Sequence, residues 1–90
     1  MISFKIVVES IYEFLQENHE GYSIWYDCDS DLRYGFIICR LYESYRKYSC
    51  ITIHIYDLGV VKVGIDNEPS SYNFKLEDPE LLSKLSELLA

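Results

Sequence analysis

The feature that most constrains the fold is the middle segment 22–65, where β-branched and aromatic residues form short runs separated by turn residues. Such runs are typical of β-strands, and the turns divide this segment into four strands of an antiparallel meander. A three-residue loop at 57–59, in which Gly59 supplies a positive φ, predicts that Ile55 faces Val61. The two strands flanking this loop therefore form one hairpin.

The preceding hairpin is predicted to have a tight turn around Ser44 and Tyr45, which places Ile38 opposite Ile51. With this pairing, both hairpins put their apolar residues on the same side of the sheet, and we expect this side to face the core. The predicted core face consists of Tyr22, Ile24, Tyr34, Phe36, Ile38, Ile51, Ile53, Ile55, Val61, Val63 and Ile65.

Amphipathic helices are predicted on both sides of the meander, because the apolar residues there follow a 3.6-residue period. The first runs from Ser3, a predicted N-cap, to Asn18, and Gly21 is expected to end the segment in the left-handed region. Asp78 is the predicted N-cap of the last helix. The buried stripe of that helix is expected to be Leu81, Leu82, Leu85, Leu88 and Leu89.

Residues 72–76 predict a short fifth strand between the meander and the last helix. The whole chain of 90 residues is long enough for one hydrophobic core and too short for two. The sequence therefore predicts a single α+β domain over residues 1–90. It consists of an N-terminal helix, an antiparallel four- to five-stranded β-meander and a C-terminal helix.

The net charge of −7 indicates which partners the chain can bind. Direct binding to nucleic acid or to an anionic membrane requires a basic surface, so we expect neither. A protein with a basic surface fits better. The N-terminus lacks the pattern of a signal peptide, and we expect a cytoplasmic protein, in the host cytoplasm if the chain is viral.

Acidity is concentrated in the first third of the chain. No lysine or arginine occurs between Ile6 and Leu32, whereas this stretch carries seven carboxylates. Their summed charge equals the net charge of the whole chain, −7. These carboxylates are Glu9, Glu13, Glu17, Glu20, Asp27, Asp29 and Asp31. Helical spacing puts the first three about 6 Å apart along one exposed edge, at a small cost in helix stability. The sequence favours a partner-binding role for them, and a solvated helix face is the alternative.

The aspartates at 27, 29 and 31 also begin like a calcium-binding EF-hand loop. The sixth loop position is Leu32 instead of glycine, and the twelfth is Ile38 instead of glutamate. We therefore expect a solvated acidic hairpin loop and no metal site, with a weak divalent-cation site as the alternative.

Catalytic patterns are missing from the sequence, and we predict neither an enzyme nor a cofactor. His19 and His54 stand in no spacing that supplies a nucleophile or an orienting acid. The cysteines form no CxxC pair. In the predicted register Cys39 faces Cys50, and we expect these two to be reduced, half-buried thiols, with a dithiol pair as the alternative.

The second face of the predicted sheet is unusually aromatic. It is expected to carry Trp25, Ile37, Cys39, Leu41, Tyr48, Cys50, Thr52, His54 and Tyr56. Tyrosine and tryptophan are enriched at protein interfaces, so we predict that Trp25, Tyr48 and Tyr56 contribute to partner binding. The alternative is that the C-terminal helix covers this face.

Length, element order and concentrated acidity together resemble the small phage-encoded inhibitors of bacterial defence. These include anti-CRISPR proteins that present carboxylates to a nucleic-acid-binding site. The resemblance covers the whole chain and implies stoichiometric inhibition, without assigning a role to any residue.

The sequence thus predicts a non-catalytic protein-binding inhibitor. Its acidic surface would occupy the basic site of a nucleic-acid-handling protein as a nucleic-acid mimic. A second interpretation is a homo-oligomerising or adaptor domain, such as a homodimer, that binds through the aromatic sheet face. A third is a small divalent-metal-dependent enzyme at the three aspartates.

Overall fold

A computed structural model describes residues 3–29, 31–41, 50–66, 68–69 and 71–90 of the chain. The elements in chain order are α1 (Phe4–Asn18), β1 (Tyr22–Asp29), β2 (Tyr34–Leu41), β3 (Cys50–Tyr56), β4 (Val60–Ile65), β5 (Tyr72–Lys75) and α2 (Leu81–Leu89). The strands form one antiparallel sheet in the order β1-β2-β3-β4-β5. The predicted α+β fold and its order of elements are therefore confirmed.

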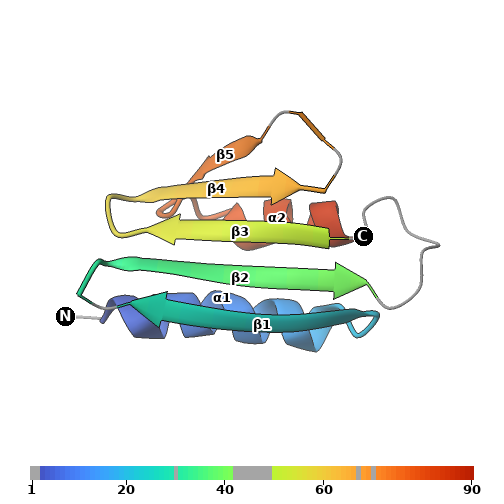
Figure 1. Ribbon diagram of the computed structural model, residues 1–90, viewed down its shortest axis with the longest axis horizontal. Coiled ribbons are helices and arrows are strands. Elements are labelled where there is room, and N and C mark those ends of the chain that lie inside the picture. The colour runs from blue at the N-terminus through green and yellow to red at the C-terminus, as the bar shows by residue number, and fades with distance from the viewer. Residues whose placement is uncertain (1–2, 30, 42–49, 67, 70) are drawn as a thin grey trace.

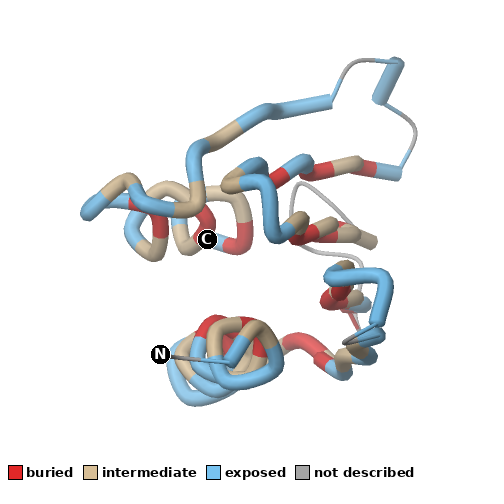
Figure 2. Tube along the Cα trace, turned by 90° about the vertical axis from the view of Figure 1, so that its left-hand side faces the viewer, coloured by how far each residue is buried: buried red, intermediate tan, exposed pale blue. Residues whose placement is uncertain are grey.

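Both helices lie on the same side of the sheet, so the protein has two layers. Figure 1 shows α1 behind β1 and β2, with α2 behind β3 and β4. Seen from the side, the two helices lie on one side and the strands on the other (Figure 2). The buried core between the layers consists of Val8, Ile11, Leu15, Tyr22, Ile24, Ile37, Cys39, Leu41, Ile51, Ile53, Ile55, Val61, Val63, Ile65, Leu81, Leu85 and Leu89. We call the sheet face that supplies part of this core the helix face, and the opposite one the open face.

The register of the β3–β4 hairpin agrees with the prediction. Ile55 pairs with Val61, and Ile51 pairs with Ile65. Gly59 in the connecting turn has a φ of 90°, a conformation that glycine adopts at little cost. This turn fixes which residues of β3 and β4 point toward the helices.

The predicted register of the β2–β3 hairpin is wrong by one residue. Ile37 pairs with Ile53, and Ile38 pairs with Thr52. Because side chains alternate across a sheet, this slip exchanges the two faces of β2. Tyr34, Phe36 and Ile38 lie on the open face instead of in the core, whereas Gly35, Ile37, Cys39 and Leu41 lie on the helix face. The predicted turn at residues 44–45 lies outside the described residues.

A close approach of helix α1 accounts for the position of Gly35 in β2. A Cβ atom at this position would lie 2.8 Å from Cγ2 of Val8, a fully buried residue of α1. The glycine therefore leaves room for the helix to pack directly on the strand. The apolar pattern of β2 gives no sign of this contact, because nearly every residue of the strand is apolar.

The helix ends match the predictions in part. Ser3 is the N-cap of α1, and its Oγ accepts a hydrogen bond of 3.3 Å from the Ile6 N–H. Gly21 does not adopt a positive φ, and the C-cap of α1 is His19. The N-cap of α2 is Glu80 instead of Asp78, without a side-chain hydrogen bond to the helix.

His19 also joins the two helices. Its side chain is buried, and Nε2 lies 2.6 Å from Oγ of Ser86 in α2. This contact holds the end of α1 beside α2 on the helix face. Within the described part of the chain, neither helix combines the length and apolarity required to cross a membrane.

Candidate functional site

The predicted acidic surface is divided between two sides of strand β1. Glu9, Glu13 and Glu17 belong to α1, and Glu20 follows the helix. Asp27 and Asp29 share the open face with Trp25, because these three residues occupy every second position of β1. The helix carboxylates and the strand carboxylates therefore do not form one continuous surface. We call Glu13, Glu17 and Glu20 the acidic helix stripe.

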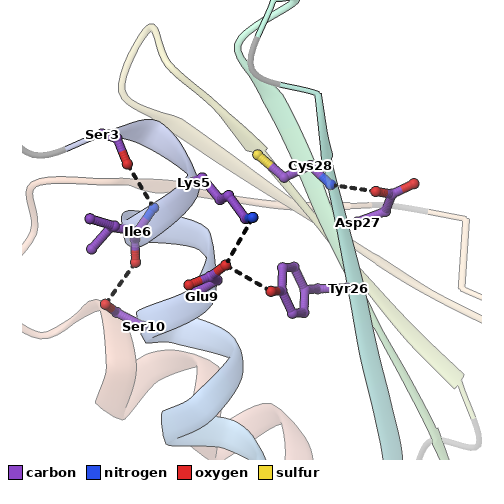
Figure 3. A network of polar contacts seen from close by, with 8 residues as sticks. All are labelled: Ser3, Lys5, Ile6, Glu9, Ser10, Tyr26, Asp27 and Cys28. Carbon is purple, nitrogen blue, oxygen red and sulfur yellow. Dashed lines mark hydrogen bonds and ion pairs between the residues drawn. The ribbon is translucent and has the colours of Figure 1, made fainter.

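Glu9 differs from the acidic helix stripe because it has partners within the fold. Its Oε1 accepts a hydrogen bond of 2.9 Å from the Tyr26 hydroxyl and lies 3.7 Å from the Lys5 Nζ. Figure 3 shows Glu9 of α1 and Tyr26 of β1 pointing toward each other. This hydrogen bond to Glu9 is the main reason that the pKa of Tyr26 is raised. Glu9 therefore fastens α1 to the edge strand of the sheet.

The stripe itself is exposed. Glu13, Glu17 and Glu20 are all open to solvent. Among the described residues, none donates a hydrogen bond or forms an ion pair to these three carboxylates. Their negative charge is therefore directed outward from the helix layer.

The aspartates near residue 30 organise the end of the β1–β2 hairpin. Oδ1 of Asp29 accepts hydrogen bonds from the N–H groups of Asp31 at 3.0 Å and Leu32 at 3.1 Å. Oδ1 of Asp27 accepts one of 2.8 Å from the Cys28 N–H. These carboxylates stabilise the local backbone, as is common for aspartate in turns. Among the described residues, no group of three His, Cys, Asp or Glu side chains could hold a metal ion.

Arg33 connects the two hairpins at this end of the sheet. It adopts a φ of 51°, in the left-handed region, and its Nη1 lies 2.6 Å from Oδ2 of Asp57. Asp57 also donates its backbone N–H to the Arg33 carbonyl at 3.1 Å. The turn after β1 and the turn after β3 are thereby fixed side by side.

An aromatic cluster centred on Tyr34 lies on the open face. Its ring centroid is 6.2 Å from that of Phe36, 5.2 Å from that of Tyr56 and 5.9 Å from that of His54. The Tyr34 hydroxyl is hydrogen-bonded to Nδ1 of His54 at 2.6 Å. Burial, followed by repulsion from Tyr56, raises the pKa of Tyr34 and keeps its phenol protonated. The cluster therefore presents one stacked pair, Tyr34 and His54, and two tilted rings around a hydrogen-bonded centre.

The predicted interface residues Trp25 and Tyr56 both lie on the open face, and Tyr48 lies outside the described residues. Trp25 remains 41% exposed, with the Arg40 guanidinium 5.9 Å from its ring centroid. Tyr34 and Phe36 were missed as surface residues because the sequence-based register placed them in the core. The contact that decides the register, between Gly35 of β2 and Val8 of α1, joins residues of different elements and gives no signal in the sequence.

A hollow of about 540 Å³ joins the aspartate turn to the aromatic cluster. It is lined by Asp27, Cys28, Asp29, Asp31, Leu32, Tyr34 and Phe36. Carboxylates and aromatic faces both attract cations, so the chemistry of this hollow suits a lysine or arginine side chain. It adds a second acidic feature to the acidic helix stripe.

The cysteines lie on different faces of the sheet. Cys39 is buried on the helix face, where it pairs with Ile51, whereas Cys50 pairs with Arg40 on the open face. The predicted juxtaposition of Cys39 and Cys50 is therefore wrong, and both are free thiols. Burial raises the pKa of the Cys39 thiol to about 12.

No protein-family profile matches the chain, and the comparisons with curated proteins and with solved structures found no match either.

Proposed function

We propose that the protein is a non-catalytic inhibitor that binds the basic site of a nucleic-acid-handling protein. The observation that carries the proposal is the acidic helix stripe, whose three carboxylates are exposed and face away from the core. Along the helix these carboxylates take the place of phosphates at the lysine and arginine side chains of the partner. The bound inhibitor therefore blocks the site at which the partner would bind nucleic acid.

Charge distribution supports this proposal. In sequence, the nearest cationic side chain to the stripe is that of Lys5. It pairs with Glu9, which lies about one helical turn before Glu13, the first residue of the stripe. The field around the C-terminal half of α1 is therefore negative, which accelerates association with a positively charged surface and makes it sensitive to salt. This mode of inhibition is the one implied by the resemblance to phage-encoded inhibitors of bacterial defence.

The proposal is tested by capture of a partner from a lysate, with a variant of the stripe and a control of equal charge. The variant is Glu13→Gln, Glu17→Gln and Glu20→Gln, and the control changes the exposed Glu77, Glu80 and Glu87 to glutamine. We expect the parent and the control to retain a nucleic-acid-binding protein that the stripe variant loses. Added DNA or RNA should release it.

Two results would contradict the proposal. Equal loss with the stripe variant and the control would mean that only the net charge matters. A partner that remains bound in excess nucleic acid would mean that the protein does not occupy a nucleic-acid site.

A second candidate function is an adaptor that binds through the open face. It is favoured by the aromatic cluster around Tyr34 and by the exposed Trp25. In that case substitutions on the open face, and not those on the acidic helix stripe, would abolish capture of the partner.

A further inference from the structure

The open face has the composition of an interface. Neither helix covers it, since α1 and α2 both pack on the other side of the sheet (Figure 2). We propose that the protein forms a homodimer in which this face packs against the same face of a second copy. The two copies are related by a two-fold axis that runs parallel to β3, between the two sheets.

The size of the face fits such a dimer. Five strands about 4.8 Å apart and up to eight residues long give about 500 Å² of flat area per copy. Two copies cover about 1,000 Å², which is the minimum area for a biological interface, and the corrugated side chains add to that value. Face-to-face packing of two sheets within about 30° of alignment is the common arrangement of β-sandwiches.

The charges at the ends of the face favour this orientation. An axis along β3 exchanges β1 with β5 and β2 with β4, and it preserves the position of each residue along the strands. Asp29 of β1 and Lys75 of β5 lie at the end of the sheet that holds the β1–β2 and β3–β4 turns. The axis therefore brings Asp29 of one copy over Lys75 of the other. At the opposite end, Arg40 of β2 meets Asp66, which directly follows β4.

The shape of the face is complementary in the same arrangement. Ile38 and Gly64 are both aligned with Thr52, on opposite sides of β3, so the axis brings the isoleucine of one copy over the glycine of the other. A hollow of about 570 Å³ surrounds Gly64, bordered by Thr52 and His54. A Cβ atom at Gly64 would contact nothing within 4 Å. This hollow has room for a side chain of the second copy.

The other two-fold arrangement, with the axis across the strands, lacks these matches. An axis that crosses the middle of the sheet, at Tyr26 and Ile37, places Asp29 over Ser23 and Tyr34 over Arg40, so that the acidic and basic ends no longer meet directly. It also aligns Gly64 with Lys62 instead of with a large apolar residue. The axis parallel to β3 is therefore the arrangement that satisfies both charge and shape.

The net charge of −7 opposes this dimer only weakly, because much of the negative charge lies far from the interface. The acidic helix stripe lies on the helix layer, which points away from the second copy in a face-to-face dimer. The dimer is independent of the proposed function, and it leaves both copies of the stripe exposed on its outer sides.

Gly64→Phe is the sharpest test, because its Cβ meets nothing within 4 Å and its ring extends into the hollow that the second copy would occupy. Sedimentation equilibrium of the full chain should give a dimer for the parent and a monomer for this variant, with thermal unfolding of the variant monomer remaining cooperative. Leu58→Phe, in the exposed turn between β3 and β4, is the matched control and should remain dimeric.

Charge reversal tests the orientation. Arg40→Asp and Asp66→Arg should each weaken dimerisation by about tenfold, because each change affects two symmetry-related pairs. The double variant should recover most of the parent's affinity. A parent that is monomeric at every concentration overturns the dimer and leaves the open face to a different protein. A dimer that is unaffected by Gly64→Phe, or not restored in the double variant, overturns the arrangement.

Discussion

The helix face and the open face belong to the same strands, yet their side chains differ in kind. On the helix face β3 contributes Ile51, Ile53 and Ile55, which are fully buried. On the open face the same strand contributes Thr52, His54 and Tyr56, which are half-buried. The backbone is common to both faces, so the difference lies in the side chains and in what covers them.

This difference indicates how stability and recognition are divided in the molecule. Branched aliphatic residues fill the space beneath α1 and α2 and exclude water from it. Rings, hydroxyl groups and charged groups on the open face can be desolvated by a second surface without being required for the fold. Substitutions on the helix face should therefore affect folding, and those on the open face should affect association.

The largest difference between the faces is expected along β3. Ile53→Ala should lower the free energy of unfolding by about 2 to 5 kcal/mol, because Ile53 is fully buried and the cavity is not refilled. Tyr56→Ala, on the open face of the same strand, should cost much less. Chemical denaturation of the two variants measures both values, and similar losses would break the distinction between the faces.

A second comparison uses the two glycines that lie on opposite faces. Gly35→Ala should cost about 1 to 3 kcal/mol, because the added Cβ lies 2.8 Å from Cγ2 of Val8. Gly64→Ala meets open space and should leave the stability within about 0.5 kcal/mol of the parent. A destabilised Gly64→Ala and a neutral Gly35→Ala would reverse the assignment of the faces.

The buried thiol of Cys39 gives the helix face a pH dependence. Its pKa rises from 9.0 to about 12 on folding. Between these two values the Cys39 thiol ionises only in the unfolded chain, so the free energy of unfolding falls as the pH rises. Between pH 8 and pH 10 this loss should be about 1.4 kcal/mol. Denaturation of the parent and of Cys39→Ala across this range isolates the contribution, and parallel pH profiles would contradict it.

The smallest expected effect concerns the surface of α1. Glu13→Gln with Glu17→Gln should change stability by only a few tenths of a kcal/mol, in the stabilising direction, because a repulsive pair is removed. Glu9→Gln should instead be destabilising, since the Tyr26 hydroxyl and Lys5 both contact this carboxylate. Thermal unfolding of the two variants gives the comparison, and a gain in stability with Glu9→Gln would show that its contacts are unimportant.

The elements were predictable from the sequence where one physical signal dominated. The period of apolar residues located α1 and α2, and Gly59 fixed the β3–β4 register. In β2 almost every residue is apolar, so alternation could not identify the inward side. What decides it is the contact between Gly35 and Val8, which exists only in the folded protein.

The candidate site was predictable to a similar extent. Local acidity identified the acidic helix stripe, because a charge pattern along a helix depends only on the sequence. The contact between Glu9 and Tyr26 joins residues from different elements, and the cluster around Tyr34 depends on the β2 register. Neither the contact nor the cluster can therefore be predicted from the spacing of residues in the sequence.

Two neighbouring isoleucines of β2 test the assignment of the faces most directly. Ile37 is fully buried on the helix face, and Ile38 lies half-buried on the open face. We expect Ile37→Ala to lower the free energy of unfolding by about 2 to 5 kcal/mol and Ile38→Ala to lower it by less than about 1 kcal/mol. Urea denaturation of both variants, at a protein concentration low enough to favour the monomer, measures the difference. A larger loss for Ile38→Ala than for Ile37→Ala would contradict it.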